Sequence, residues 1–428
     1  MGTIMTSIYQ KIIRDLKESI DLNQLKKGDR IPSVRQLSKY YACSKDTVQK
    51  ALLELKYQRY IYAVPKSGYY VLGKVSDKVE NQLSLEDYHN FAYSDFKLCL
   101  NEAMTNNDNY LFNYYSQVEG LADLRQALEL HLNQQSVYCK AKDIIITSGT
   151  QQALYILSQL HFMENKEIIL LEKPTYSRME KMVKDLGVPF QTIQRTFQGL
   201  DLEQLESIFQ KGKIKFFYTI PHFSSPLGLS YNNAEKKAII DLAEKYDVYI
   251  IEDDFMGDFA ASKQVPIHYF DTHQRVIYLK SFSMSLFPSL RIGALVIPET
   301  LKDLFLKHKS MIDLDTNLIM QKALSLYLTN GMFARNFRHL RNYFQEKMDQ
   351  IEDYLNEKYP ELAFRISPQF LILAFSSQIP KIKSLSSRDY EYLPLSDHTY
   401  IKLNLLKVRP DVIDSLISDL LPATETRK

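Results

Sequence analysis

The first seventy residues contain three stretches whose apolar side chains recur at helical spacing. The first stretch presents one apolar face, formed by Ile8, Ile12, Ile13, Leu16 and Ile20. Ser33 and Ser44 each precede a further helical stretch, where a serine side chain can cap free backbone N–H groups. Two short runs of strand-forming residues follow, Tyr60–Val64 and Tyr69–Leu72. The pattern predicts helix, helix, turn, helix and a β-hairpin wing.

This order of elements suits DNA, because the helix that begins after Ser44 can enter the major groove. Arg35 lies where the preceding helix would cross the sugar-phosphate backbone, and the turn at 65–68 forms a wing tip for the minor groove. The positions suited to DNA contact are Ser33, Arg35, Ser44, Lys45, Thr47, Lys50, Lys66 and Gly68. Each basic residue alone is more often a solvated surface charge than a DNA contact. Their ordered combination favours DNA binding.

From about residue 94, helical stretches alternate with short runs of β-branched and aromatic residues. Five runs are predicted to form buried parallel strands, at 144–146, 168–171, 216–219, 248–251 and 276–279. The segments Gln151–Phe162 and Asn233–Tyr246 fit helical crossovers between them. The pattern predicts a doubly wound α/β domain whose ligand sits at the carboxyl ends of the strands.

The stretch 73–93 is polar and lacks an apolar period, so we expect a connector that is helical in part. The predicted organisation is a DNA-binding domain at 1–72, a linker at 73–93 and an α/β domain at 94–428.

Charge is divided unevenly along the chain. Residues 1–72 hold 13 Lys and Arg against 6 Asp and Glu, a balance of +7, whereas the rest holds 40 against 45, a balance of −5. A basic first segment on an acidic remainder indicates a polyanion partner for the first segment only.

The composition, with 45% hydrophobic and 24% charged residues, is typical of a soluble globular protein. No run of eighteen apolar residues and no export signal is recognisable, so a cytoplasmic location without membrane contact is expected. Cys43, Cys99 and Cys139 stand in no metal-ligand spacing, and we expect reduced thiols and no metal site.

The first segment resembles a GntR-type winged helix-turn-helix. The matching stretches are 28–37, 44–48 and 67–71. The resemblance implies that Arg35, Lys45 and Thr47 contact DNA. Many relatives carry arginine at the position of Lys45, and a lysine keeps a phosphate contact but loses bidentate guanine readout.

The remainder is similar to fold-type-I pyridoxal-phosphate (PLP) enzymes of the aminotransferase type. The matching stretches, in chain order, are 115–125, 147–154, 172–178, 221–228, 251–255 and 278–293. A GntR-like head joined to such a body resembles the MocR-type transcriptional regulators. The resemblance implies a multidomain protein, with an α+β winged helix-turn-helix and an α/β transferase-like domain of aminotransferase fold type I. It further implies double-stranded DNA as a partner, a head-to-tail homodimer, and a body that senses PLP and often a small amino compound.

Carried over by this resemblance, the residues expected to bind the cofactor form three groups. The phosphate cradle consists of Ser148, Gly149, Thr150, Gln151, Ser281, Ser283 and Arg291, with Tyr115 reaching a partner subunit's phosphate site. Asp253 would pair with the pyridine nitrogen, and Tyr176 would stack on the ring. Arg178 and Lys402 would lie near the effector, whose identity the sequence leaves open.

Three positions depart from the pattern of the enzymes. Met284 stands where the resemblance places the lysine that attaches PLP covalently, Phe255 where it places a tyrosine against the ring hydroxyl, and Ser225 where asparagine or an aromatic residue is usual. A thioether can neither form an imine nor carry a proton. We therefore assign no catalytic residue and expect a DNA-binding regulator that senses PLP non-covalently or senses another small ligand. Two alternatives stay open: an active PLP enzyme with a DNA-binding head, in which Lys280 replaces the missing lysine, and a ligand-free dimerisation scaffold.

Overall fold

The computed structural model describes residues 8–58, 60–64, 67–72, 85–105, 118–161, 165–375, 390–394 and 399–420. The chain divides into two compact units. One falls within Met1–Ser116, Leu121–Leu128 and Asn317–Leu340, and the other within Gln117–Gly120, Glu129–Thr316 and Arg341–Lys428. Among the described residues, no helix is long and apolar enough to span a membrane, and no cluster of three metal-ligating side chains is present.

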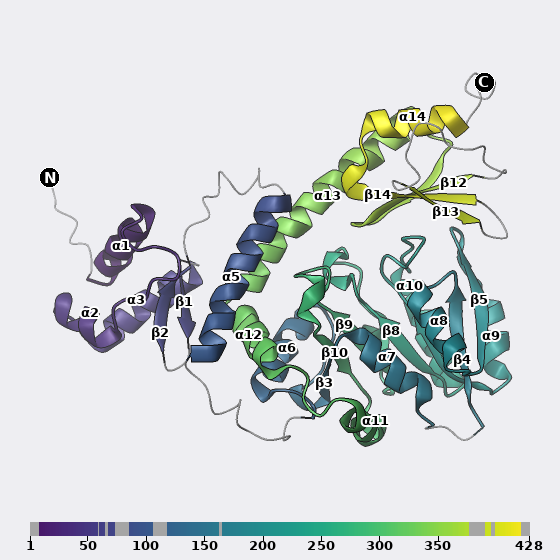
Figure 1. The fold of residues 1–428 in the computed structure, drawn as a ribbon, viewed down its shortest axis with the longest axis horizontal. Helices are drawn as coiled ribbons and strands as arrows, with labels where there is room; N and C mark the ends of the chain where they lie inside the picture. The colour runs from purple at the N-terminus through teal and green to yellow at the C-terminus, as the bar shows by residue number, and fades with distance from the viewer. Residues whose placement is uncertain are drawn as a thin grey trace. The chain divides into compact units, whose positions relative to one another are not determined.

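The winged helix-turn-helix lies in the first unit. Its elements are α1 (Ile8–Asp21), α2 (Val34–Tyr40), α3 (Lys45–Tyr57), β1 (Ile61–Val64) and β2 (Gly68–Val71), as Figure 1 shows. The apolar faces of the three helices share one core, in which Ile12, Val48 and Leu52 are fully buried. Each such side chain contributes roughly 1.5–3 kcal/mol when removed from water. The predicted order of elements is confirmed.

Three further helices complete the first unit, namely α5 (Leu85–Thr105), α12 (Leu318–Thr329) and the first turns of α13 (Met332–Lys358). Asp95 of α5 is fully buried and accepts a hydrogen bond from Asn336 Nδ2 at 2.8 Å, while Arg335 forms an ion pair with the same carboxylate. Helix α5 begins inside the predicted connector, and residues 73–84 lie outside the described part of the chain.

The second unit is built on an eight-stranded sheet of order β3-β10-β9-β8-β7-β4-β5-β6. The bounds of these strands are β3 (Ile144–Thr147), β4 (Ile168–Lys173), β5 (Phe190–Thr196), β6 (Gly199–Leu200), β7 (Ile214–Thr219), β8 (Tyr249–Asp253), β9 (Val276–Ser281) and β10 (Gly293–Val296). All five predicted strands are present. They run in the same direction, as predicted, but the sequence pattern did not indicate β10, which inserts antiparallel between β3 and β9. A short return connection from β9 suffices for antiparallel pairing, so no helical crossover marks β10 in the sequence.

Helices cover both faces of this sheet. On one face, α7 (Thr150–Gln159), α8 (Ser177–Asp185) and α11 (Glu299–Ile312) share a buried core with alternate strand residues. On the other face lie α9 (Leu202–Gln210), whose Phe209 meets Phe217 of β7 at a ring-centroid distance of 6.3 Å, and α10 (Asn233–Lys245). One further helix, α6 (Ala122–Asn133), is divided between the units. Its first half belongs to the first unit.

A smaller antiparallel sheet of order β11-β12-β14-β13 follows in the second unit. Its elements are β11 (Ala363–Ile366), β12 (Phe370–Phe375), β13 (Tyr390–Pro394) and β14 (Thr399–Asn404), followed by α14 (Pro410–Leu420). Leu227 and Leu229 pack against Ile372 and Tyr400 of this sheet. The small sheet therefore holds the loop that carries residues 221–229.

Candidate functional site

The candidate site lies where strands of the large sheet end. Asp253 ends β8, Ser281 ends β9, and Thr147 ends β3 immediately before α7. These three strands run in the same direction, so their carboxyl ends lie at one edge of the sheet. That edge is where open α/β sheets bind ligands.

Two glycines let the N-terminus of α7 approach Arg291 closely. Gly149 caps the helix with a φ of +83°, and a Cβ added there would lie 2.8 Å from Arg291 Nη2. A Cβ on Gly293 would lie 2.8 Å from the Thr150 nitrogen. Arg291 is exposed, and its Nη2 donates to the Ser148 carbonyl at 3.4 Å. A guanidinium beside free helix N–H groups is suited to a phosphate.

Ser148 is engaged by a carboxylate that the sequence did not indicate. Its Oγ donates to Asp313 Oδ2 at 2.7 Å, and Thr316 Oγ1 donates to the same oxygen at 3.2 Å. The Ser148 N–H donates to Gln152 Oε1 at 2.8 Å. Ser148 thus supports the cradle through its carbonyl, and a direct contact to a phosphate stays a prediction.

Asp253 is held from one side only. Its Oδ2 accepts a hydrogen bond from Tyr218 at 2.7 Å, whereas its buried Oδ1 has no partner among the described residues. Burial raises the pKa of Asp253 to about 6. A buried acceptor of this kind fits a protonated ring nitrogen such as that of PLP, and the role expected for Asp253 stays a prediction.

The expected ring-stacking residue is held beside the cradle. Gln151 Nε2 donates to the Tyr176 hydroxyl at 3.1 Å, and the Tyr176 ring packs against the same core as Phe255. At the end of β9, the Ser283 N–H donates to Ser281 Oγ at 3.2 Å. The structure thus joins Gln151 to Tyr176 and Ser281 to Ser283.

Met284 contacts the small sheet rather than standing free in the site. Gln369 directly precedes β12, and its Nε2 lies 2.8 Å from Met284 Sδ. The thioether is half-buried.

Lys280 does not reach this site. Asp253 is paired with Leu279 in the parallel register, and neighbouring strand residues point to opposite faces, so Lys280 lies on the face opposite Asp253 and Ser281. Its side chain is fully buried, with Nζ 2.6 Å from Asp258 Oδ1. Lys280 is therefore a buried, paired lysine on the face opposite Asp253, which counts against the alternative in which it replaces the missing lysine.

Two buried polar networks fix the loop that follows β7, and the sequence pattern indicated neither. Arg195 is paired with Glu172, with Nη1 2.9 Å from Oε2, and donates to the carbonyls of Ile220 at 2.8 Å and Leu229 at 3.3 Å. The loop residue His222 is 2.7 Å from Asp254 Oδ1 through Nδ1 and 2.7 Å from Lys236 Nζ through Nε2. Neither network shows in the sequence, because its members come from separate elements.

The remaining predicted site residues are less closely gathered. Arg178 is exposed on α8. Lys402 Nζ pairs with Glu391 at 3.0 Å and lies 4.0 Å from the centroid of the Phe370 ring, so its charge is already compensated. Tyr115 lies outside the described residues, as does Lys66 in the wing.

In the winged helix, the first turn of α3 is capped by Ser44. Its Oγ accepts from the Thr47 N–H at 3.1 Å and is 2.9 Å from Thr47 Oγ1. Ser33 caps α2 in the same way, in a capping box with Gln36. Arg35, Lys45 and Lys50 are exposed, and Gly68 has a φ of +127° at the wing.

Two further residues of the winged helix lie outside the predicted set. Arg30 donates to the carbonyl of Ser67 beside Gly68, and Tyr40 at the end of α2 is 80% exposed. Tyr40 falls three residues after the buried Leu37, a spacing typical of an apolar face, so the sequence pattern gave no signal of its exposure.

The fold and the site define a class of protein, a winged helix-turn-helix regulator joined to an aminotransferase-type α/β domain. Residues 8–71 match the bacterial regulatory proteins of the gntR family, and residues 41–375 match the aminotransferases of class I and II. The chain belongs to the family of HTH-type transcriptional regulators that join these two domains. It is 41% identical to the uncharacterized HTH-type transcriptional regulator YcxD of Bacillus subtilis over 347 residues, which cover 79% of this chain and 78% of that protein.

A second relative is the HTH-type transcriptional regulator NorG of Staphylococcus aureus, at 25% identity over 78% of this chain and 83% of that protein. Among solved structures, a kynurenine aminotransferase of Pyrococcus horikoshii matches with a TM-score of 0.65 at 24% identity, covering 86% of this chain and 92% of its own. A multiple-substrate aminotransferase of Thermococcus profundus matches with a TM-score of 0.64 at 23% identity, covering 76% and 88%. These two likenesses support the fold alone.

Proposed function

We propose that this chain is a cytoplasmic, MocR-type transcriptional regulator, a head-to-tail homodimer that binds double-stranded DNA through its winged helix and whose aminotransferase-like body is not catalytic. The head is supported by the exposed Arg35, Lys45 and Lys50 around a capped recognition helix. The relatives named as HTH-type transcriptional regulators support the same reading.

The observation that carries the proposal for the body is Met284 at the position where the enzymes' lysine is expected, in a chain that keeps a cradle suited to phosphate. The thioether of Met284 lies next to Gln369 and offers no nucleophilic nitrogen. Lys280 lies on the face of the sheet opposite Asp253. PLP, when bound, would supply an electron-withdrawing pyridine ring, but Met284 offers no amine to hold that group covalently. Arg291 with the N-terminus of α7 would hold the phosphate, and Asp253 would accept from the ring nitrogen. We therefore propose that the body senses PLP, or a related phosphorylated compound, by non-covalent binding.

DNA binding is tested by gel shift and footprinting with genomic fragments at moderate salt. We expect Lys45→Ala and Arg35→Ala to weaken specific binding at least tenfold, since each loses a contact to phosphate or base. Lys11→Ala is the matched control, because it removes the same charge from α1. If DNA binding falls equally in all three variants, the loss of affinity reflects net charge alone. The absence of a specific site on the DNA would overturn the proposal.

Binding by the body is tested with PLP and dialysis. The wild-type protein is expected to gain thermal stability with PLP, to lose PLP on dialysis, and to retain no label after borohydride reduction. Arg291→Ala is expected to abolish the stabilisation, while Arg409→Ala, at an exposed position away from the site, keeps it. Label that borohydride fixes to the wild-type protein would support the rival reading, a PLP enzyme. An unchanged melting temperature with both PLP and phosphate would support a ligand-free scaffold.

Met284→Lys probes how much of the PLP site this chain retains. If only the lysine is missing, the variant is expected to hold PLP through dialysis and to be labelled by borohydride. A variant that stays unlabelled would indicate that Phe255 and Ser225 have altered the site further. Met284→Leu is the control, since it preserves volume without adding an amine.

A further inference from the structure

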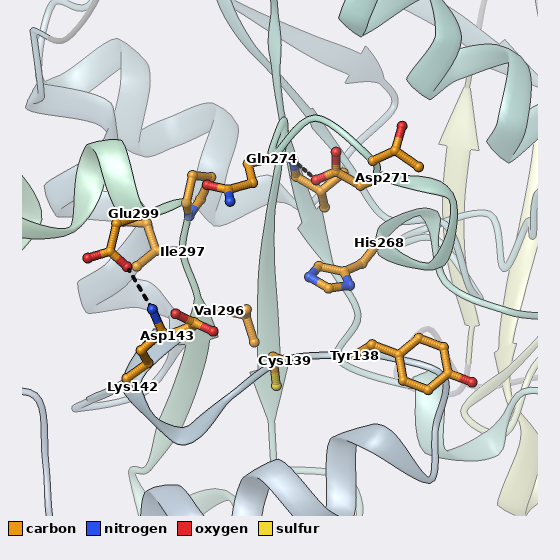
Figure 2. Close-up of a pocket in the computed structure, with 13 residues that line it drawn as sticks. Tyr138, Cys139, Lys142, Asp143, His268, Asp271, Gln274, Val296, Ile297 and Glu299 are labelled. Carbon is orange, nitrogen blue, oxygen red and sulfur yellow. Dashed lines mark hydrogen bonds and ion pairs between the residues drawn. The ribbon is translucent and has the colours of Figure 1, made fainter.

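A second cavity lies at the opposite end of the large sheet, where β3 and β9 begin and β10 ends. Its volume is about 370 Å³, within the range of small-molecule sites. Val276 at the start of β9 and Val296 at the end of β10 line it, whereas Asp253 and Ser281 lie at the other ends of β8 and β9. Figure 2 shows the His268 ring directed toward Cys139 and Val296. The cavity is therefore distinct from the candidate PLP site.

His268 brings an unsatisfied polar atom to this cavity. It lies in the 3-10 helix η4 (Ile267–Phe270), where the backbone N–H groups of Ile267 and His268 donate to Glu252 at 2.7 Å and 2.8 Å. Its ring meets Tyr278 edge-on at a centroid distance of 6.0 Å, so the imidazole is held in place. Its buried Nδ1 has no partner among the described residues, and a buried polar atom of this kind calls for one.

The charges around the cavity favour a cation. Asp143, Asp271 and Glu299 line it together with a single cation, Lys142. Lys142 and Glu299 are 3.8 Å apart, and both are largely exposed, so they screen each other at the mouth. The Asp271 carboxylate already accepts hydrogen bonds from backbone N–H groups, including that of Val276 at 2.8 Å. Asp143 Oδ2 accepts a hydrogen bond from the Lys140 backbone N–H at 3.1 Å, but its negative charge has no compensating side-chain cation among the described lining residues.

The other side chains narrow the chemistry of the ligand. Burial lowers the pKa of His268, so the neutral ring can offer Nδ1 as an acceptor. Burial raises the pKa of Cys139 to about 12, and the lining thiol is therefore neither a nucleophile nor a metal-binding thiolate. Val276, Val296 and Ile297 supply an apolar wall, and Tyr138 stands at the mouth.

We propose that this cavity binds a small primary alkylamine, as its ammonium ion. The ammonium group pairs with Asp143 and donates a hydrogen bond to His268 Nδ1, while its carbon chain packs on the valine wall. A ligand with its own carboxylate is disfavoured, because Asp143 and Glu299 would face it. The site thus selects amines that lack the acid group of an amino acid.

The test is isothermal titration calorimetry of the full chain with n-butylamine, 1-butanol and butyrate at matched ionic strength. Butylamine is expected to bind, with butanol at least tenfold weaker and butyrate not detected. Asp143→Asn is expected to weaken butylamine binding about tenfold, because it removes one charge-assisted partner. His268→Phe fills the cavity and removes the acceptor, and binding is expected to be lost.

Asp241→Asn is the control, since it removes an exposed carboxylate that pairs with Lys237 on α10. Circular dichroism and DNA binding verify that each variant is folded. Equal butylamine affinity in wild type, Asp143→Asn and His268→Phe would overturn the proposal, as would tighter binding of butyrate or no binding of butylamine at millimolar concentration.

Discussion

At the residue scale, Asp253 shows what burial does to a single carboxyl group. Tyr218 satisfies one of its oxygens, and the other has no partner among the described residues. The folded pKa of about 6 lies above the ordinary value of 3.8, so the folded state holds a proton that the unfolded state has released between these values. Folding stability from this group is therefore lost as pH rises from about 4 to about 6.

We expect Asp253→Asn to stabilise the ligand-free protein at pH 7 and to change little below pH 4. The upper limit of the gain is roughly 3 kcal/mol, from two pKa units of difference. Urea unfolding of both proteins at several pH values measures it. PLP should stabilise the wild type more than the variant, and a variant that loses stability at pH 7 would contradict the stated cause.

The sequence was informative at this scale wherever a single residue carries the chemistry. Asp253 and Met284 could be assigned by position within short motifs. Tyr218, Asp313 and Gln369 could not, because they meet their partners from 35, 165 and 85 residues away. The face on which Lys280 lies could not be read from the sequence, because it depends on the register of β9 with its neighbour.

At the element scale, the N-terminus of α7 depends on a backbone conformation that only glycine adopts readily. Gly149 combines a φ of 83° with a ψ of 164°, and its missing Cβ leaves room for Arg291. The winged helix was predicted in full, since caps and apolar faces are local signals. Strand β10 was missed because its antiparallel pairing needs only a short connection.

Gly149→Ala is expected to cost about 1–3 kcal/mol of folding stability and to abolish stabilisation by phosphate or PLP. The added Cβ would lie 2.8 Å from Arg291 Nη2 and displace it. Gly212→Ala is the matched control, because Gly212 also has a positive φ, 67°, but has no atom within 4 Å of the added Cβ. Thermal melts with and without phosphate separate loss of the cradle, expected for Gly149→Ala alone, from the destabilisation that a positive φ causes in each variant.

The cap of α3 yields a prediction for the DNA-binding element. Ser44→Ala removes the acceptor for the Thr47 N–H and is expected to cost about 1 kcal/mol of stability. It also frees the Thr47 hydroxyl, so affinity for the operator should fall while non-specific binding stays nearly constant. Ser44→Asp, which keeps the cap but adds charge near phosphates, should preserve stability and still weaken DNA binding.

At the scale of the whole molecule, the basic segment 1–72 and the acidic remainder of the chain differ in the ligands they suit. The uneven charge along the sequence predicts this division, and the two family matches support it. If the body regulates the head, PLP must change the affinity for the operator, and the operator must change the affinity for PLP by the same factor. Titrating PLP with and without operator DNA, and operator with and without PLP, tests this equality. Equal affinities in all four titrations would show that the body does not regulate DNA binding through PLP.

The burial of Lys280 against Asp258 also limits how this chain could regain an enzyme's lysine. Shifting β9 by one residue, so that Lys280 faced the candidate site, would move every side chain of the strand to the opposite face of the sheet. Methionine has a single codon, ATG, and one base change at position 284 gives AAG, a lysine codon. A genetic selection for transaminase activity should therefore enrich mutations at codon 284, and leave codon 280 untouched.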